Sequence, residues 1–153
     1  MTLGHSDIGG YTSLNISYDG YEFKILRNKD LLLRWIEMST FSDIVMRTHP
    51  SNKPLINYQI YSDNGTAQFL AYFVKQHMAL AYYKKDLMIE ANTQGIPMVR
   101  SFMMNFPDDA NGRAITDQFM LGDHIIMAPI FEDGQQFINV YLPAGTWKHL
   151  WTD

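Results

Sequence analysis

Two short polar clusters hold the side chains of this chain that are best placed for chemistry. The first is HSDIGGYTSL at residues 5–14, where Asp7 and Tyr11 flank a pair of glycines. Glycines allow a turn whose backbone donors approach a ligand, but an aspartate at such a corner can equally cap local amides. The residues themselves therefore leave open a ligand site and a tight strand-to-helix corner.

The second cluster is RTH at residues 47–49, which follows a short apolar run at residues 44–46. An unbroken apolar run that stops abruptly is typical of a strand buried on both faces. His49 would then lie at the carboxyl end of this strand, where active sites form in alternating barrels. A single histidine is more often structural, but two polar clusters on consecutive strand ends favour one shared site.

The segments that would position these clusters are predicted to contain helices of clear apolar periodicity. Asn28 or Asp30 is the expected N-cap of the first helix, and Gly95 is the expected stop of the second. In order, the elements are a loop or small hairpin at residues 15–29, a helix at 30–41, a strand at 44–48, a long loop at 51–65 and a long helix at 66–94.

Beyond Pro97 the apolar period falls to two, which predicts strands. A domain boundary is therefore expected near residues 95–97, with one domain at 1–95 and a second at 96–153. Trp147 and Trp151 are expected in the core of the second domain. The predicted strands are residues 98–106, 122–129, 137–142 and 147–151, with a hairpin turn at 132–135.

Composition excludes several classes of protein. With 46% apolar and 18% charged residues among 153, the chain should fold around a core. A net charge of -4 without a basic stripe argues against nucleic acid as a partner. No apolar run reaches the roughly 18 residues of a membrane helix. No cysteine is present, and the five histidines show no ligand spacing, so no metal or cofactor is expected.

Five blocks resemble, in order, the C-terminal part of glycoside hydrolase family 31, the α-glucosidase family. Tyr11 together with the RTH block is most similar to the sulfoquinovosidases, since ordinary α-glucosidases usually have Phe and an RNH-like block there. The chain departs from that pattern at Pro50-Ser51-Asn52, where Glu-Gly-Asn is usual, and at residues 100–102. The blocks are HSDIGGYTSL, LLLRWIEMSTFSDIVMRTH, GIPMVRSFMMNFPDD, DQFMLGDHIIMAPIFEDG and VYLPAGTWKHLWTD.

The resemblance implies an α/β fold, with the last two strand-helix units of a (β/α)8 TIM barrel followed by the start of an all-β sandwich. It implies a retaining α-glycoside hydrolase, either a sulfoquinovosidase or an α-glucosidase, whose substrate is a carbohydrate. His49 would bind a sugar hydroxyl, and Asp7 would either bind a sugar hydroxyl or orient an arginine from upstream of this chain. The Tyr11 hydroxyl would donate to a sulfonate oxygen, directly or through a water, unless Tyr11 is a rim aromatic without an anionic partner. Both catalytic aspartates would lie upstream of Met1, so no catalytic residue is expected here.

Other acids of the chain do not replace those aspartates. Asp43 precedes a predicted strand, and Asp108 and Asp109 lie in a predicted turn, so structural roles are expected for all three. The alternative function is a truncated, non-catalytic remnant that binds sugar weakly or needs a partner chain. Neither the compartment nor the oligomeric state is indicated by the sequence.

Overall fold

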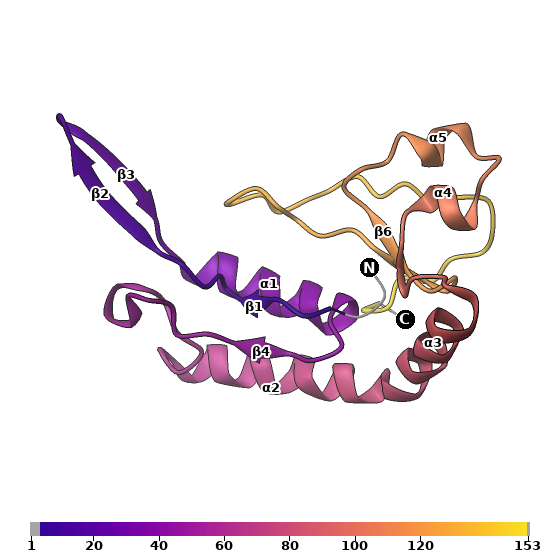
Figure 1. Cartoon of the computed structure of the whole chain (residues 1–153), viewed down its shortest axis with the longest axis horizontal. Helices are drawn as coiled ribbons and strands as arrows, with labels where there is room; N and C mark the ends of the chain where they lie inside the picture. Colours follow the sequence, from indigo (N-terminus) through magenta and orange to yellow (C-terminus); the bar gives the residue numbers. More distant parts are fainter. Residues whose placement is uncertain (1–3, 153) are drawn as a thin grey trace.

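A computed structural model describes residues 4–152, which form a mixed fold of helices and short sheets (Figure 1). Strands β1 (Asp7–Ile8) and β4 (Arg47–Thr48) pair in parallel, and helix α1 (Lys29–Ser42) lies between them in the sequence. The expected mixture of helix and sheet is therefore confirmed. Residues 1–3 and 153, the outer ends of the two predicted domains, lie outside the described residues.

Helix α1 begins where its cap predicts. The Asn28 side chain accepts a hydrogen bond from the Leu31 N–H at 2.8 Å, which satisfies one of the free donors of the first turn. The helix packs against α2 (Asn64–Ala79) and against β1. The core of this first cluster consists of Ile8, Leu32, Ile36 and Phe73.

The single long helix predicted at residues 66–94 is wrong, because the structure has two helices. Helix α2 ends at Ala79, and α3 (Ala81–Gln94) turns away from it after Leu80, whose φ is -82° and ψ is -1° (Figure 1). This turn lets α3 pack on the C-terminal sheet rather than continue along α1. Gly95 ends α3 in the left-handed conformation with φ 74°, as predicted.

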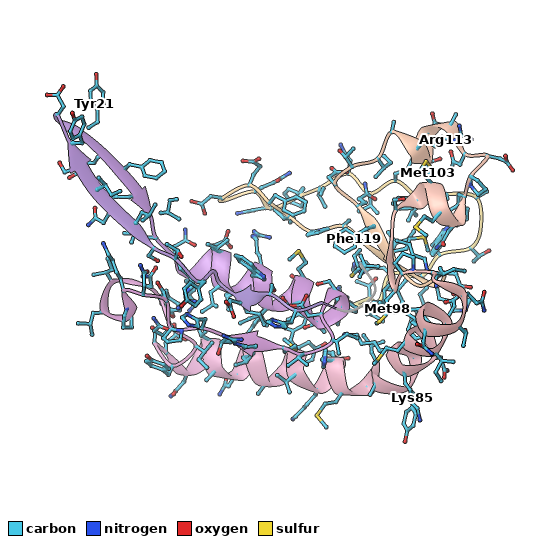
Figure 2. All side chains as sticks on the ribbon, viewed as in Figure 1. Tyr21, Lys85, Met98, Met103, Arg113 and Phe119 are labelled. Carbon is cyan, nitrogen blue, oxygen red and sulfur yellow. The ribbon has the colours of Figure 1, made fainter. Side chains whose placement is uncertain are left out.

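The segment predicted as a loop or small hairpin at residues 15–29 contains a hairpin. Strands β2 (Leu14–Tyr18) and β3 (Tyr21–Ile25) pair antiparallel around Asp19 and Gly20, which both have positive φ as a type I′ turn requires. The hairpin projects from the body, and Tyr21 lies at its tip (Figures 1 and 2). The cross-strand pairs Leu14–Ile25, Ile16–Phe23 and Tyr18–Tyr21 lie on one face.

The C-terminal sheet contains three antiparallel strands in the order β5 (Val99–Arg100), β6 (Phe119–Leu121) and β7 (Ile125–Met127). It packs on α3 through a second core cluster, which joins residues on both sides of the predicted boundary at 95–97. This cluster consists of Phe41, Leu87, Met98, Leu121 and Met127.

All four predicted C-terminal strands differ from the structure. Of the strand predicted at residues 122–129 only β7 is present, and β6 lies outside every predicted strand. Residues 98–106 contain β5 and then a helical turn, α4 (Phe102–Asn105), because the ring of Phe102 turns inward and is fully buried. Residues 137–142 and 147–151 are not strands. Their polar groups bond to other partners, as the N–H of Tyr141 does to Gln118 Oε1 and the indole of Trp147 does to the Pro143 carbonyl.

The remaining C-terminal elements are short. A four-residue helix, α5 (Ala110–Arg113), follows α4. Residues 132–135 form a turn with a bond from Gln135 N to Glu132 O at 3.3 Å, but the flanking residues 128–131 and 136–142 are not strands, so the predicted hairpin is wrong. Trp151 packs on Phe73 of α2 rather than within a sandwich, and 41% of its surface is exposed.

Strand β4 is shorter than the predicted strand at residues 44–48. The N–H of Ile44 bonds to Gly4 O, and its carbonyl contacts His77 Nε2 at 3.1 Å, so neither group is free for a strand ladder. Within residues 4–152, β1 and β4 form a sheet of two strands with no further strand on either side. No helix in this range combines the length and the apolar character needed to cross a lipid bilayer.

Candidate functional site

The structure brings Tyr11 and His49 into direct contact. Their ring centroids lie 4.3 Å apart with an interplanar angle of 32°. Tyr11 follows β1 and His49 follows β4, so the parallel pairing carries both side chains to the same edge of the sheet. His49 is half-buried and Tyr11 is 56% exposed, so a ligand can reach the tyrosine.

The hydrogen bond on one ring nitrogen fixes the tautomer of His49. Its Nδ1 accepts from the Ser51 N–H at 2.9 Å. In the neutral imidazole the proton must then lie on Nε2. His49 therefore presents an N–H donor at Nε2, which suits an oxygen of a sugar hydroxyl.

A buried polar network joins the Tyr11 segment to the loop after His49. The Ser13 N–H donates to Asn52 Oδ1 at 2.7 Å, and the Ser13 hydroxyl lies 2.9 Å from the Ser51 hydroxyl and from Asn57 Oδ1. Ser51 adopts φ 74°, a conformation that favours glycine. The departure at Pro50-Ser51-Asn52 was the only sequence signal for this network.

Asp7 pairs with an arginine of the chain itself, which the sequence reasoning missed. Its Oδ1 lies 3.2 Å from Arg47 Nε, the residue opposite it in the β1–β4 register. This Oδ1 is buried and has no hydrogen-bond partner among the described residues. The guanidinium of Arg47 is half-exposed, so the ion pair is weakly stabilising and leaves Asp7 able to accept a bond from a ligand.

A cavity of about 300 Å³ opens beside His49, at the lower end of the size range of small-molecule sites. Neither Tyr11 nor Asp7 lines it. A larger cavity of about 420 Å³ lies between α1 and residues 129–133 and contains none of the three predicted site residues. The cavity at His49 is lined by Arg27, Thr48, His49, Pro50, Gln59, Ile60 and Tyr61.

Two of the three acids expected to be structural, Asp43 and Asp109, make structural contacts. Asp43 accepts from the Ser6 N–H at 2.9 Å and from the Ser6 hydroxyl at 2.8 Å. Asp109 caps α5, and the bond from the Gly112 N–H, helped by the Tyr141 hydroxyl, lowers the pKa of its carboxyl group. Within residues 4–152, no three His, Cys, Asp or Glu side chains gather as a metal site.

Comparison with known proteins identifies the class of protein. Residues 95–153 match the model of the glycosyl hydrolase family 31 C-terminal domain. The fold is similar to that of a family 31 sulfoquinovosidase from E. rectale solved with an aza-sugar inhibitor. The TM-score is 0.82, with 40% identity, 92% of this chain covered and 20% of that one. The chain belongs to glycoside hydrolase family 31.

Within this family the chain is similar to sulfoquinovosidases. It is 37% identical to the sulfoquinovosidase of Escherichia coli K12 over 150 residues, 98% of the chain, and 37% identical to that of Agrobacterium fabrum C58 over 149 residues. A probable α-glucosidase of rice is 29% identical over 123 residues. The chain spans about a fifth, 21%, of the length of each sulfoquinovosidase.

Proposed function

We propose that this chain forms part of the sugar-binding wall of a retaining α-glycoside hydrolase that acts on α-linked sulfoquinovosides, with α-glucosides as the second substrate class. The observation that carries the proposal is the contact of Tyr11 with His49 at 4.3 Å, which joins two motifs separated by more than thirty residues of sequence. The 37% identity to two sulfoquinovosidases supports the same substrate class.

The proposed architecture is the end of a (β/α)8 barrel followed by the start of a β-sandwich. In it, β1 with α1 and β4 with α2 and α3 are the seventh and eighth strand-helix units. The parallel pairing of β1 with β4 around a helical connection supports this assignment. The family match begins at residue 95, which supports the division into domains at 1–95 and 96–153.

In this proposal the catalytic carboxylates are not among these 153 residues. A retaining glycosidase needs two of them about 5 to 5.5 Å apart. The family resemblance assigns both to earlier barrel strands, so the chain by itself binds sugar and does not hydrolyse it. His49 donates from Nε2 to a sugar hydroxyl, Asp7 accepts from a second hydroxyl, and Tyr11 donates to a sulfonate oxygen.

The test is the substrate selectivity of Tyr11→Phe in the native protein. Loss of one hydrogen bond to a charged group should lower kcat/KM for an aryl α-sulfoquinovoside by about tenfold to a hundredfold. The same change should leave an aryl α-glucoside within about threefold, because an uncharged hydroxymethyl needs only packing against the ring. Tyr18→Phe, at an exposed hairpin position, is the matched control.

Two results would contradict the proposal. Equal effects of Tyr11→Phe on both substrates would remove the sulfonate assignment. A native protein without turnover of either substrate would favour the alternative, a non-catalytic remnant that binds sugar weakly or needs a partner chain. His49→Ala should weaken binding of both sugars, since in this proposal His49 contacts a hydroxyl that they share.

A further inference from the structure

Arg27 is a buried cation two residues after the end of the hairpin, and only 5% of its surface is exposed. Its guanidinium donates from Nε to the Tyr58 carbonyl at 2.6 Å and from Nη2 to Gln59 Oε1 at 2.8 Å. Its Nη1 donates to the carbonyls of His49 at 2.7 Å and Ile8 at 3.4 Å. All four acceptors are neutral groups.

Two of these acceptors lie at the carboxyl ends of the paired strands. Ile8 is the last residue of β1, and His49 directly follows β4. The backbone pairing of β1 with β4 stops there. The planar guanidinium of Arg27 therefore bridges the two strand ends beyond the last backbone hydrogen bonds. A single rigid group thus fixes the separation of the two segments that carry Tyr11 and His49.

The close approach of Arg27 explains one of the two glycines in the opening motif. A Cβ at Gly9 would overlap Arg27 Cδ and lie 2.7 Å from Nη1, and the φ of Gly9 is +85°. Any side chain at Gly9 would therefore displace the guanidinium. This contact gives the glycine a role in holding Arg27, apart from any approach of the backbone to a ligand.

Burial of this charge has a cost that the contacts do not remove. Desolvation lowers the pKa of the Arg27 guanidinium below its ordinary value, yet the group stays charged. A buried charge without an opposite partner stabilises a fold poorly compared with an apolar side chain. Its bonds do, however, fix one arrangement of the two strand ends, which an apolar side chain would not.

We propose that Arg27 is the positioning residue of the sugar site, which holds the His49 backbone and the Gly9 corner so that the Tyr11 and His49 rings stay in contact. Of the two readouts described below, only sugar binding rests on the proposed function. The inference adds a residue that acts through the His49 carbonyl.

The experiment compares Arg27→Met and Arg27→Lys with Arg34→Met in the native protein. Arg34 is the matched control, because it also donates to a distant carbonyl, that of Gln135 at 2.7 Å, but in the C-terminal part of the chain. The readouts are the ¹⁵N signals of the His49 ring, which report its tautomer, and the Kd for an aryl α-sulfoquinovoside.

Arg27→Met should mix the two His49 tautomers and weaken binding by at least about tenfold, since displacements near 1 Å cost that much or more. Arg27→Lys should give an intermediate loss, because an ammonium replaces only part of the fork. Arg34→Met should change Kd by less than about twofold, because the Arg34 side chain bonds to Asp30 and to the Gln135 carbonyl rather than to the His49 segment.

An unchanged His49 spectrum and Kd in Arg27→Met would overturn the inference. If that variant does not fold, Arg27→Lys decides: an altered ring spectrum with weaker binding supports positioning, and wild-type values for both overturn it. Failure of the proposed function is separable, because it would appear as wild-type affinity in His49→Ala. The ring spectrum of the Arg27 variants would still report whether His49 is positioned.

Discussion

Lys84 of α3 gives the fold a pH dependence that can be calculated from its surroundings. Its ammonium is buried at the C-terminal end of α1, where it donates to the carbonyls of Thr40 at 2.8 Å and Asp43 at 2.7 Å. The third donor reaches His77 Nδ1 at 2.9 Å, so every N–H has an acceptor. Burial nevertheless lowers the pKa of Lys84 from 10.5 to about 8, against the opposing charge of Asp43.

The sign of the effect follows from where the proton is held. Between pH 8 and 10.5 the unfolded chain keeps a proton that folded Lys84 has released, so the free energy of unfolding rises with pH. Integrating these two pKa values gives a rise of about 2 kcal/mol between pH 7 and pH 9.5. This is an upper limit, because carbonyls at a helix C-terminus favour the charged ammonium.

Urea unfolding of Lys84→Met at several pH values isolates this contribution. Methionine fills a similar volume without a charge, so the free energy of unfolding of the variant should lack the rise, and the difference between wild type and variant should change by about 2 kcal/mol between pH 7 and pH 9.5. Lys85→Met is the matched control, since Lys85 is the next residue of α3 and is exposed (Figure 2). The range stops at pH 9.5 because burial raises the pKa of Tyr83, which titrates above it. Parallel pH curves for wild type and Lys84→Met would refute the reasoning.

Two further predictions concern residues with positive φ. Ser51→Gly should change the free energy of unfolding by less than about 1 kcal/mol, because relief of strain at φ 74° offsets the lost bond to Ser13, whereas Ser51→Ala should lose about 1 to 2 kcal/mol in urea unfolding. Equal losses in both would contradict this. Gly122→Ala should cost about 2 to 4 kcal/mol by calorimetry, since its φ is +59° and a Cβ would overlap the Tyr83 hydroxyl; a loss below 1 kcal/mol would exclude that clash.

The sequence was sufficient to predict the end of a helix where a capping residue or a glycine marks that end. Helix α1 starts after Asn28 and helix α3 ends at Gly95, as the types of these two residues predicted. The break at Leu80 has no Pro or Gly to announce it. It follows from packing, because α3 places Leu87 against the C-terminal sheet and Lys84 against the end of α1.

Strand predictions failed where alternation had no ladder partner. Residues 137–142 alternate as a strand would, but the Tyr141 N–H bonds to the Gln118 side chain instead of a neighbouring strand. A period of two describes which side chains face the same way, not where the backbone bonds go. The single-sequence pattern therefore could not separate a strand from an extended segment.

The residues of the candidate site also fall into those that the sequence could predict and those that it could not. The meeting of Tyr11 and His49 was predictable, because each follows a strand and parallel strands end at one edge. Arg27 was not, since an arginine in a polar segment has no local signature and its acceptors lie far away in the sequence. The partner of Asp7 required the strand register, which places Arg47 opposite it.

In the proposed enzyme Tyr11 determines substrate specificity, whereas Arg27 contributes to affinity for both substrates. In the proposal, only the hydroxyl of Tyr11 discriminates between the two substrate classes. Tyr11→Phe should therefore change the ratio of kcat/KM for the sulfoquinovoside to kcat/KM for the glucoside. Arg27 acts on His49, which contacts a hydroxyl that both sugars share, so its removal should weaken both by the same factor. Measuring both variants on both substrates therefore distinguishes a residue that reads the substrate from one that holds the site in place.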